Sequence, residues 1–162
     1  MRKGELESSS FNCNPWDPVR LRAALPTIRM LTREKDPVVF IPELQDICAK
    51  CGVAVVIEKS PSECRASGAT RFLGGDKALL MLSFRHLSDD HFWFTFFHEV
   101  GHLLLHGLDR TFIEGDQLCS DGEALEEEAN KFASGVVVPP EYQNAMRALP
   151  VDGRKVIRFA KQ

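Results

Sequence analysis

The feature that most restricts the fold of this chain is an apolar run over residues 92–108 that ionisable side chains interrupt. The interrupting residues are His98, Glu99, His102 and His106. A membrane-spanning helix needs about 20 predominantly apolar residues, so this run is too short and too polar to cross a bilayer. Residues 88–90 offer N-cap side chains ahead of it, which predicts one long helix ending near residues 106–107.

This helix is expected to have two chemically different faces, because successive side chains turn by about 100° around its axis. The polar face carries His91, Thr95, His98 and His102. The apolar face carries Trp93, Phe97, Val100 and Leu104. We expect the apolar face to pack on a core and the polar face to line a cleft, as in an active-site helix.

Residues 98–102 read His-Glu-Val-Gly-His. Histidines four positions apart on a helix lie about 6 Å from each other on one face, so both imidazoles can reach one metal ion. Glu99 is turned aside from both, where it can act on a water molecule at the metal without binding the metal itself. The motif predicts His98 and His102 as metal ligands and Glu99 as the general base. Two surface histidines beside an unrelated glutamate are the alternative.

A catalytic zinc ion needs a third protein ligand besides the two histidines. The metzincin spacing would require Gly and His where this chain has Leu105 and Leu108, which excludes that class. His106 lies more than about 10 Å along the helix axis from His98. We therefore expect His106 to be a residue of the helix end, near the C-terminal dipole, rather than a ligand.

The third ligand is expected from an acidic helix predicted over residues 123–135. Its apolar stripe consists of Leu125, Ala129, Phe132 and Val136. Glu127 points away from this stripe toward water, whereas Glu126 and Glu128 flank the stripe and can reach inward. Because Glu126 shares its edge with the polar Asn130, we predict Glu126 as the third ligand and Glu128 as the second choice. A solvated acidic face is the alternative.

The remaining pattern predicts an α+β fold, in which a three-stranded sheet packs on the active-site helix beside the second ligand helix; that this is a small zincin-like domain is what the family resemblance given below implies. The other expected helices cover residues 17–35 (which Pro26 can interrupt), 42–51, 140–148 and 153–161, and the expected strands cover 53–57, 65–73 and 78–83. Residues 1–16 are predicted to be a flexible leader and residues 17–162 a single domain. The helical pattern still present at Gln162 allows for a longer native protein.

Composition excludes several classes of protein. The net charge is −3, so no strong positive field favours direct binding of nucleic acid. The N-terminus lacks the apolar segment of a secretory signal, and the odd number of cysteines, 5, fits a reducing compartment. We expect a cytoplasmic protein with no membrane partner. Cys48 and Cys51 stand at the end of a predicted helix rather than at its start, so they are interpreted as structural thiols.

Residues 98–106 and 126–133, followed by Val137, Val138 and Pro139, resemble the ImmA/IrrE family of metallo-endopeptidases. Residues 88–97 resemble the branch of that family in which the peptidase domain follows a helix-turn-helix module. The resemblance covers about residues 17–162. The chain departs from this branch in having no helix-turn-helix before residue 17.

The resemblance implies a gluzincin-like fold with zinc held by His98, His102 and Glu126, and with Glu99 as the general base. Manganese or iron also suits nitrogen and oxygen ligands of this kind. The implied substrate is a protein, namely a DNA-binding repressor or an antitoxin-type regulator. Zincins resembling this chain keep an edge strand ahead of the active-site helix, and a substrate peptide could pair with the strand at residues 78–83.

Several assignments stay open at this point. Thr95 or Asn130 could support the ligands by hydrogen bonds. Candidates for stabilising the oxyanion are Arg71, His86, His91 and Tyr142. A regulatory or antitoxin-like binding module without catalysis is the alternative function, and a metal hydrolase acting on a non-peptide substrate is a third. The sequence does not specify the oligomeric state.

Overall fold

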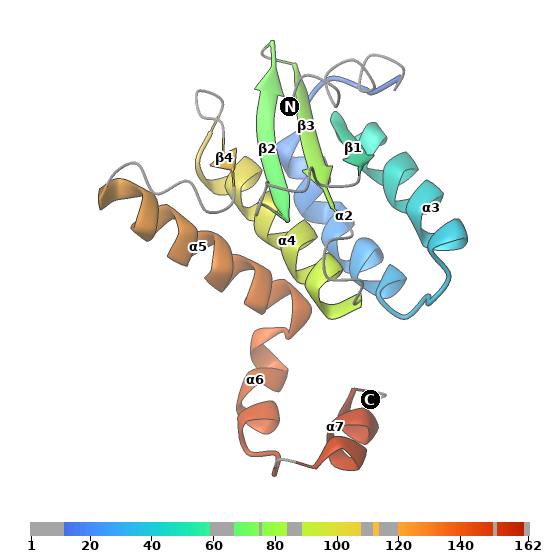
Figure 1. Ribbon diagram of the computed structural model, residues 1–162, viewed down its shortest axis with the longest axis vertical. Coiled ribbons are helices and arrows are strands. Elements are labelled where there is room, and N and C mark those ends of the chain that lie inside the picture. The colour runs from blue at the N-terminus through green and yellow to red at the C-terminus, as the bar shows by residue number, and fades with distance from the viewer. Residues whose placement is uncertain are drawn as a thin grey trace.

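The computed structural model describes residues 12–58, 67–74, 76–83, 89–107, 112–113, 120–150 and 152–160 (Figure 1). The elements are α2 (Pro18–Leu31), α3 (Pro37–Lys50), β1 (Val53–Ile57), β2 (Gly68–Leu73), β3 (Lys77–Leu82), α4 (Asp89–Leu105), β4 (Phe112–Ile113), α5 (Ser120–Val137), α6 (Pro140–Arg147) and α7 (Gly153–Phe159). The mixed α and β content confirms the predicted fold class.

The two N-terminal helices begin with the same signal, an aspartate N-cap followed by a proline. Asp17 accepts a hydrogen bond from the backbone of α2, and Asp36 does the same for α3. Helix α2 continues through Pro26 without a break. The predicted start of the second helix at residue 42 is wrong, because Asp36 and Pro37 already start α3 and Pro42 lies inside it. A proline in the first turn replaces an N–H that has no helical partner, which is why Pro37 is tolerated there.

The sheet has the strand order β1-β3-β2-β4. Strand β1 pairs with β3 in parallel, and β2 pairs with β3 in antiparallel. The three predicted strands are therefore present, and β4 extends the sheet by two residue pairs, Ala69 with Ile113 and Thr70 with Phe112. The prediction that residues 78–83 form an edge strand is wrong, since β3 is paired on both sides. Hydrophobic patterning identifies buried strands but does not specify their order in a sheet.

One face of this sheet forms the core together with α2, α3 and α4. Alternate residues of the paired strands share this face, as the two-residue period of a strand requires. They are Val53, Val55, Ala78, Leu80 and Leu82. Helices α2 and α3 bring Leu21, Ile28, Phe40 and Leu44 to the same cluster, and α4 brings Phe96 and Phe97, which are fully buried. This packing fixes α4 against the sheet.

Strand β1 is an edge strand whose free margin is contacted by a side chain of α3, and the segment that precedes α2 is hydrogen-bonded to the turn between α3 and β1. The Gln45 side chain of α3 donates a 3.0 Å hydrogen bond to the Val55 carbonyl. The backbone N–H of Asn14 donates to Ala49 and that of Asp17 to Cys51, at 3.0 and 3.1 Å. Residues 12–16, which the sequence assigned to the leader, are thus hydrogen-bonded to the body of the molecule.

Cys48 and Cys51 lie at the end of α3, as expected for structural thiols. Cys48 is fully buried, and burial raises the pKa of its thiol. The Cys51 thiol donates to the Ile47 carbonyl at 3.3 Å. Two further cysteines, Cys64 and Cys119, lie outside the described residues.

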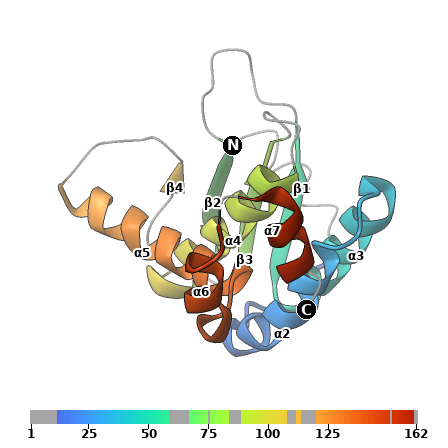
Figure 2. The same ribbon diagram turned by 90° about the horizontal axis from the view of Figure 1, so that it is seen from below.

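Helices α6 and α7 project away from the sheet and the other helices (Figure 1), so that they overlie the rest of the molecule when it is seen from below (Figure 2). Neither contains a buried residue, and Tyr142 of α6 contacts Phe159 of α7 edge to face, with ring centroids 6.3 Å apart. Both helices confirm the predicted elements at residues 140–148 and 153–161. Across the described part of the chain, no helix has the length and apolar character needed to cross a membrane.

Candidate metal centre

Helix α4 places the histidine motif inside the molecule. The exposed fractions of His98, Glu99 and His102 are 5%, 1% and 1%. The predicted apolar face of the helix does pack on the core, with Phe97 and Val100 fully buried. The polar face is covered in turn by α5 and by the start of β2, so these ionisable groups are largely removed from water.

Small residues let α4 and α5 approach each other closely at this site. A Cβ atom added at Gly101 would lie 3.2 Å from the Cα atom of Ala129 and 3.1 Å from the ring of Phe132. Ala129 and Ala133 are both fully buried. Because Gly101 lies between the two motif histidines, the closest approach of the helices falls where a side chain of α5 can reach both imidazoles.

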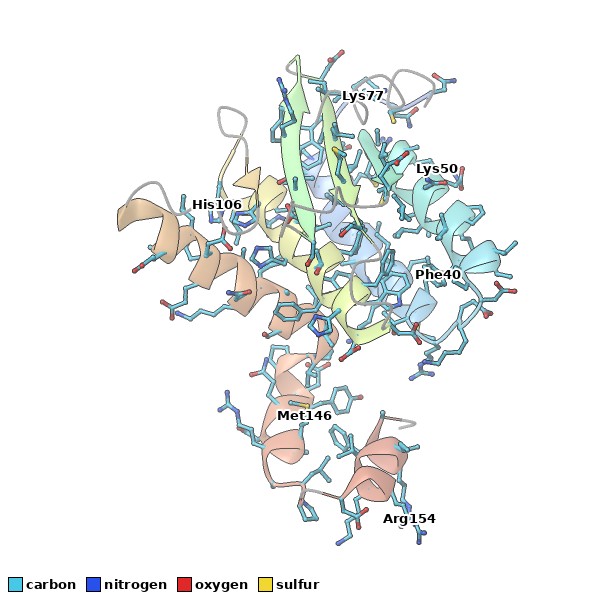
Figure 3. All side chains as sticks on the ribbon, viewed as in Figure 1. Phe40, Lys50, Lys77, His106, Met146 and Arg154 are labelled. Carbon is cyan, nitrogen blue, oxygen red and sulfur yellow. The ribbon has the colours of Figure 1, made fainter. Side chains whose placement is uncertain are left out.

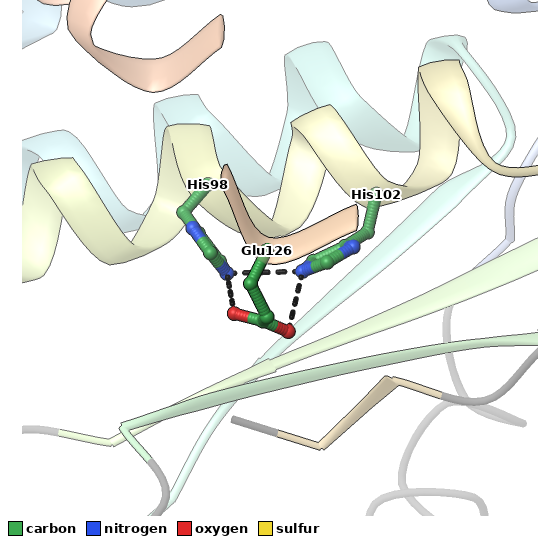
Figure 4. A group of neighbouring side chains, drawn as sticks. All are labelled: His98, His102 and Glu126. Atoms are coloured by element: carbon green, nitrogen blue, oxygen red, sulfur yellow. Dashed lines mark hydrogen bonds and ion pairs between the residues drawn. The ribbon is translucent and has the colours of Figure 1, made fainter. Parts of the chain in front are cut away.

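The side chain of Glu126, from α5, reaches the imidazoles of both His98 and His102 (Figure 4). The Nε2 atoms of His98 and His102 are 3.0 Å apart. One carboxylate oxygen of Glu126 lies 3.2 Å from Nε2 of His98, and the other lies 3.3 Å from Nε2 of His102. These three residues form the group that could hold a metal ion in the described part of the chain. The predicted ligand set His98, His102 and Glu126 therefore converges.

The spacing and chemistry of this triad fit a zinc ion. Zinc takes imidazole nitrogen and carboxylate oxygen at about 2.0–2.1 Å, and a tetrahedron with such bonds has edges of about 3.3 Å. The separation of the two Nε2 atoms, 3.0 Å, and the distances from each of them to the nearer Glu126 oxygen, 3.2 and 3.3 Å, are close to that edge, although the two distances end on different oxygens. Burial, with His98 and His106 nearby, lowers the pKa of His102 to about 3. His102 is therefore a neutral imidazole near pH 7, which is the form that binds a metal.

Three more side chains contact the triad from outside. The Nδ1 atom of His98 lies 3.0 Å from Oδ1 of Asn130. The Nδ1 atom of His102 lies 3.0 Å from Nδ1 of His106, and Nε2 of His106 lies 3.2 Å from a carboxylate oxygen of Glu128. Asn130 thus has the supporting position predicted for it. Glu128, the second choice for the ligand, contacts His106 and not the triad.

Glu99 lies against the backbone of strand β2. A Cβ atom added at Gly68 would lie 2.4 Å from a carboxylate oxygen of Glu99 and 2.7 Å from Cγ2 of Thr95. The absence of a side chain at position 68 is therefore what leaves room for the carboxylate. Sequence reasoning missed Gly68, because nothing local marks it as the residue opposite Glu99.

The described candidates for stabilising an oxyanion lie on three different elements. His91 is exposed in the first turn of α4, and Tyr142 lies on α6 against Phe159. Arg71 lies on β2, and His86 falls outside the described residues. These assignments stay predictions.

A mainly apolar hollow of about 240 Å³ lies between α4, α5 and α6. It is lined by Phe94, Ser134, Val137, Val138, Gln143, Met146 and Arg147. Phe94 precedes His98 by one helical turn, and the two rings are 6.5 Å apart. Phe94 therefore connects the hollow to one of the metal ligands, His98.

An α+β domain with two histidines on one buried helix and a glutamate from a second helix is of the zincin-like class. A sequence model of the IrrE N-terminal-like domain, the peptidase M78 family, matches residues 48–158. The chain therefore belongs to this family of metallopeptidases, which confirms the resemblance seen in its motifs. The matched range contains the whole triad. A search of curated proteins found no match to the chain.

Proposed function

We propose that this protein is a zinc-dependent endopeptidase. The observation that carries the proposal is the convergence of His98, His102 and Glu126 within 3.3 Å of one another, next to a buried Glu99. Membership of a metallopeptidase family supports it further. Three protein ligands leave one coordination position open, which distinguishes catalytic zinc sites from structural ones.

When bound there, zinc supplies Lewis acidity, which polarises the scissile carbonyl and acidifies water. Glu99 follows a ligand histidine directly in sequence, and its carboxylate is held between α4 and β2. It accepts a proton from the attacking water and delivers that proton to the nitrogen of the leaving amine. Burial strengthens both steps, because a desolvated carboxylate has few competing water partners.

We further propose that the substrate is an intracellular protein, a DNA-binding repressor or antitoxin-type regulator. The support for this is the family resemblance, together with the apolar hollow lined by Phe94, whose ring is 6.5 Å from that of His98. A hollow of this kind can accept an apolar side chain of an extended peptide next to the bond that is cut. Direct binding of DNA by this chain is not part of the proposal.

The test uses the zinc-loaded protein and the regulator encoded beside its gene. We expect the regulator to be cut into two fragments. In water enriched in oxygen-18, the new carboxyl terminus should carry the label, because the attacking water supplies that oxygen. Glu99→Gln should keep zinc and the fold but lose cleavage by more than about 100-fold. Glu126→Gln should lose zinc as well.

Two outcomes would contradict the proposal. Cleavage by Glu99→Gln at the wild-type rate would remove Glu99 from the mechanism. Binding of the regulator without any cleavage, unchanged in Glu99→Gln, would instead indicate the regulatory module that the sequence left open.

A further inference from the structure

We propose that His106 and Glu128 are positioning residues, which hold His102 in the tautomer that can bind a metal ion. The inference rests on the metal site of the proposed function. It assigns a role to two residues that lie outside the triad, and it explains why a third histidine follows the motif at the end of α4. Figure 3 shows His106 at that end of α4, on the side of α5.

The three side chains form a continuous line of contacts. Nδ1 of His102 is 3.0 Å from Nδ1 of His106, and Nε2 of His106 is 3.2 Å from the carboxylate of Glu128. The exposed fraction of the His106 side chain is 3%, whereas that of Glu128 is 60%. The line therefore runs from the buried ligand, through a buried imidazole, to a carboxylate at the surface.

Only one arrangement of protons satisfies this line when His102 is a ligand. A neutral imidazole carries one N–H, and Nε2 of His102 needs its lone pair for the metal. The proton of His102 is then on Nδ1, which donates to Nδ1 of His106. His106 in turn must carry its proton on Nε2, which donates to the carboxylate of Glu128. The carboxylate thus specifies the tautomer of His102 through His106.

His98 has a simpler form of the same support. Its Nδ1 atom lies 3.0 Å from Oδ1 of Asn130, an acceptor that likewise fixes the proton on Nδ1 and leaves Nε2 free for the metal. Helix α5 therefore provides the ligand Glu126 and also the outer partner for each histidine, directly through Asn130 and indirectly through Glu128. The two histidines differ in their support: His98 contacts Asn130 directly, whereas His102 contacts His106, which in turn contacts Glu128.

The test measures zinc affinity by competition with a chromogenic chelator. We expect His106→Leu, which removes the acceptor, to weaken zinc binding by about 10–100-fold. His106→Gln offers an amide oxygen to Nδ1 of His102 and should restore part of the loss. Glu128→Gln should weaken binding less than His106→Leu. Glu127→Gln is the matched control on the same helix and should leave zinc affinity unchanged, since Glu127 pairs with Lys131 in solvent.

A second measurement needs no variant. Long-range proton–nitrogen NMR of the zinc-loaded wild-type protein reports which ring nitrogen carries each proton. We expect His102 protonated on Nδ1 and His106 protonated on Nε2, and a merely structural His106 would not require the latter. His106 protonated on Nδ1, or unchanged zinc affinity in His106→Leu, would overturn this inference while leaving the proposed peptidase intact. A wild-type protein that binds no zinc would overturn both.

Discussion

Helices α4 and α5 both contribute to the metal centre, but they differ in how much of their surface is buried in the fold. Helix α4 is buried almost continuously from Phe92 to Leu103. Among the described side chains of α5, Ala129 and Ala133 are buried to that degree, and the side chain of Glu126 is 39% exposed. The two histidines are therefore positioned by the core of the fold. The glutamate is positioned by one stripe of small residues, so fold and metal binding should respond differently to changes in the two helices.

The largest expected effect is loss of stability from a cavity in α4. Phe97→Ala removes a fully buried ring and should lower the free energy of unfolding by about 3–5 kcal/mol. Phe132→Ala on α5 removes a partly buried ring and should cost about 1–2 kcal/mol. Urea denaturation measures both. Equal losses would show that the two helices contribute alike to the core.

Overpacking the helix contact should affect both properties at once. Gly101→Val adds atoms within about 3.2 Å of Ala129 and should cost about 1–3 kcal/mol. It should also move Glu126 away from the histidines and weaken zinc binding. Gly135→Ala on α5 is the control, because no atom lies within 4 Å of the added Cβ, and it should be neutral or slightly stabilising. Full zinc affinity in Gly101→Val would contradict this account of the contact.

The buried ligand helix should also make the metal-free protein sensitive to acid. The pKa of His102 is lowered from 6.5 to about 3, so below pH 6.5 the unfolded state binds a proton that the folded state does not. The free energy of unfolding should therefore be unaffected by this group above pH 6.5 and fall as the pH drops toward 3, by about 1–2 kcal/mol at pH 5. Denaturation at several pH values, with His102→Gln as the control, measures it. The same pH dependence in both proteins would exclude His102 as its source.

The smallest effect is expected on the outer face of α5. Lys131 and Glu127 form an ion pair of 2.7 Å with both side chains largely exposed, and such pairs contribute little to stability. Lys131→Gln should change neither the unfolding transition nor zinc affinity measurably. A clear loss of zinc affinity would mean that the exposed face of α5 takes part in positioning Glu126.

Much of the metal centre could be predicted from sequence, because its determinants repeat within single helices. The four-residue spacing of His98 and His102 and the position of Glu126 beside an apolar stripe are local properties. The role of His106 could not be predicted, since it depends on Glu128 from another helix. Gly68 was missed for the same reason: its importance comes from Glu99, which approaches it only after β2 packs on α4.

The fold shows the same division between local and distant determinants. The elements were mostly found from periodicity and capping residues, and the erroneous start of α3 came from choosing Pro42 over the equivalent signal at Asp36 and Pro37. Strand order was not predictable, because parallel pairing of β1 with β3 joins segments whose apolar patterns fit several arrangements. The local sequence was sufficient to predict most helices and strands, whereas their arrangement depends on packing between distant segments.

The hydrogen bond from Gln45 to Val55 has a consequence for how molecules of this protein meet one another. Exposed strand margins are templates on which further chains assemble. The Gln45 side chain occupies the Val55 carbonyl on the free margin of β1, and so obstructs pairing of a further strand at that edge of the sheet. Growth of a continuous sheet through many copies requires two accepting margins per copy, so this one amide is expected to help limit fibre formation.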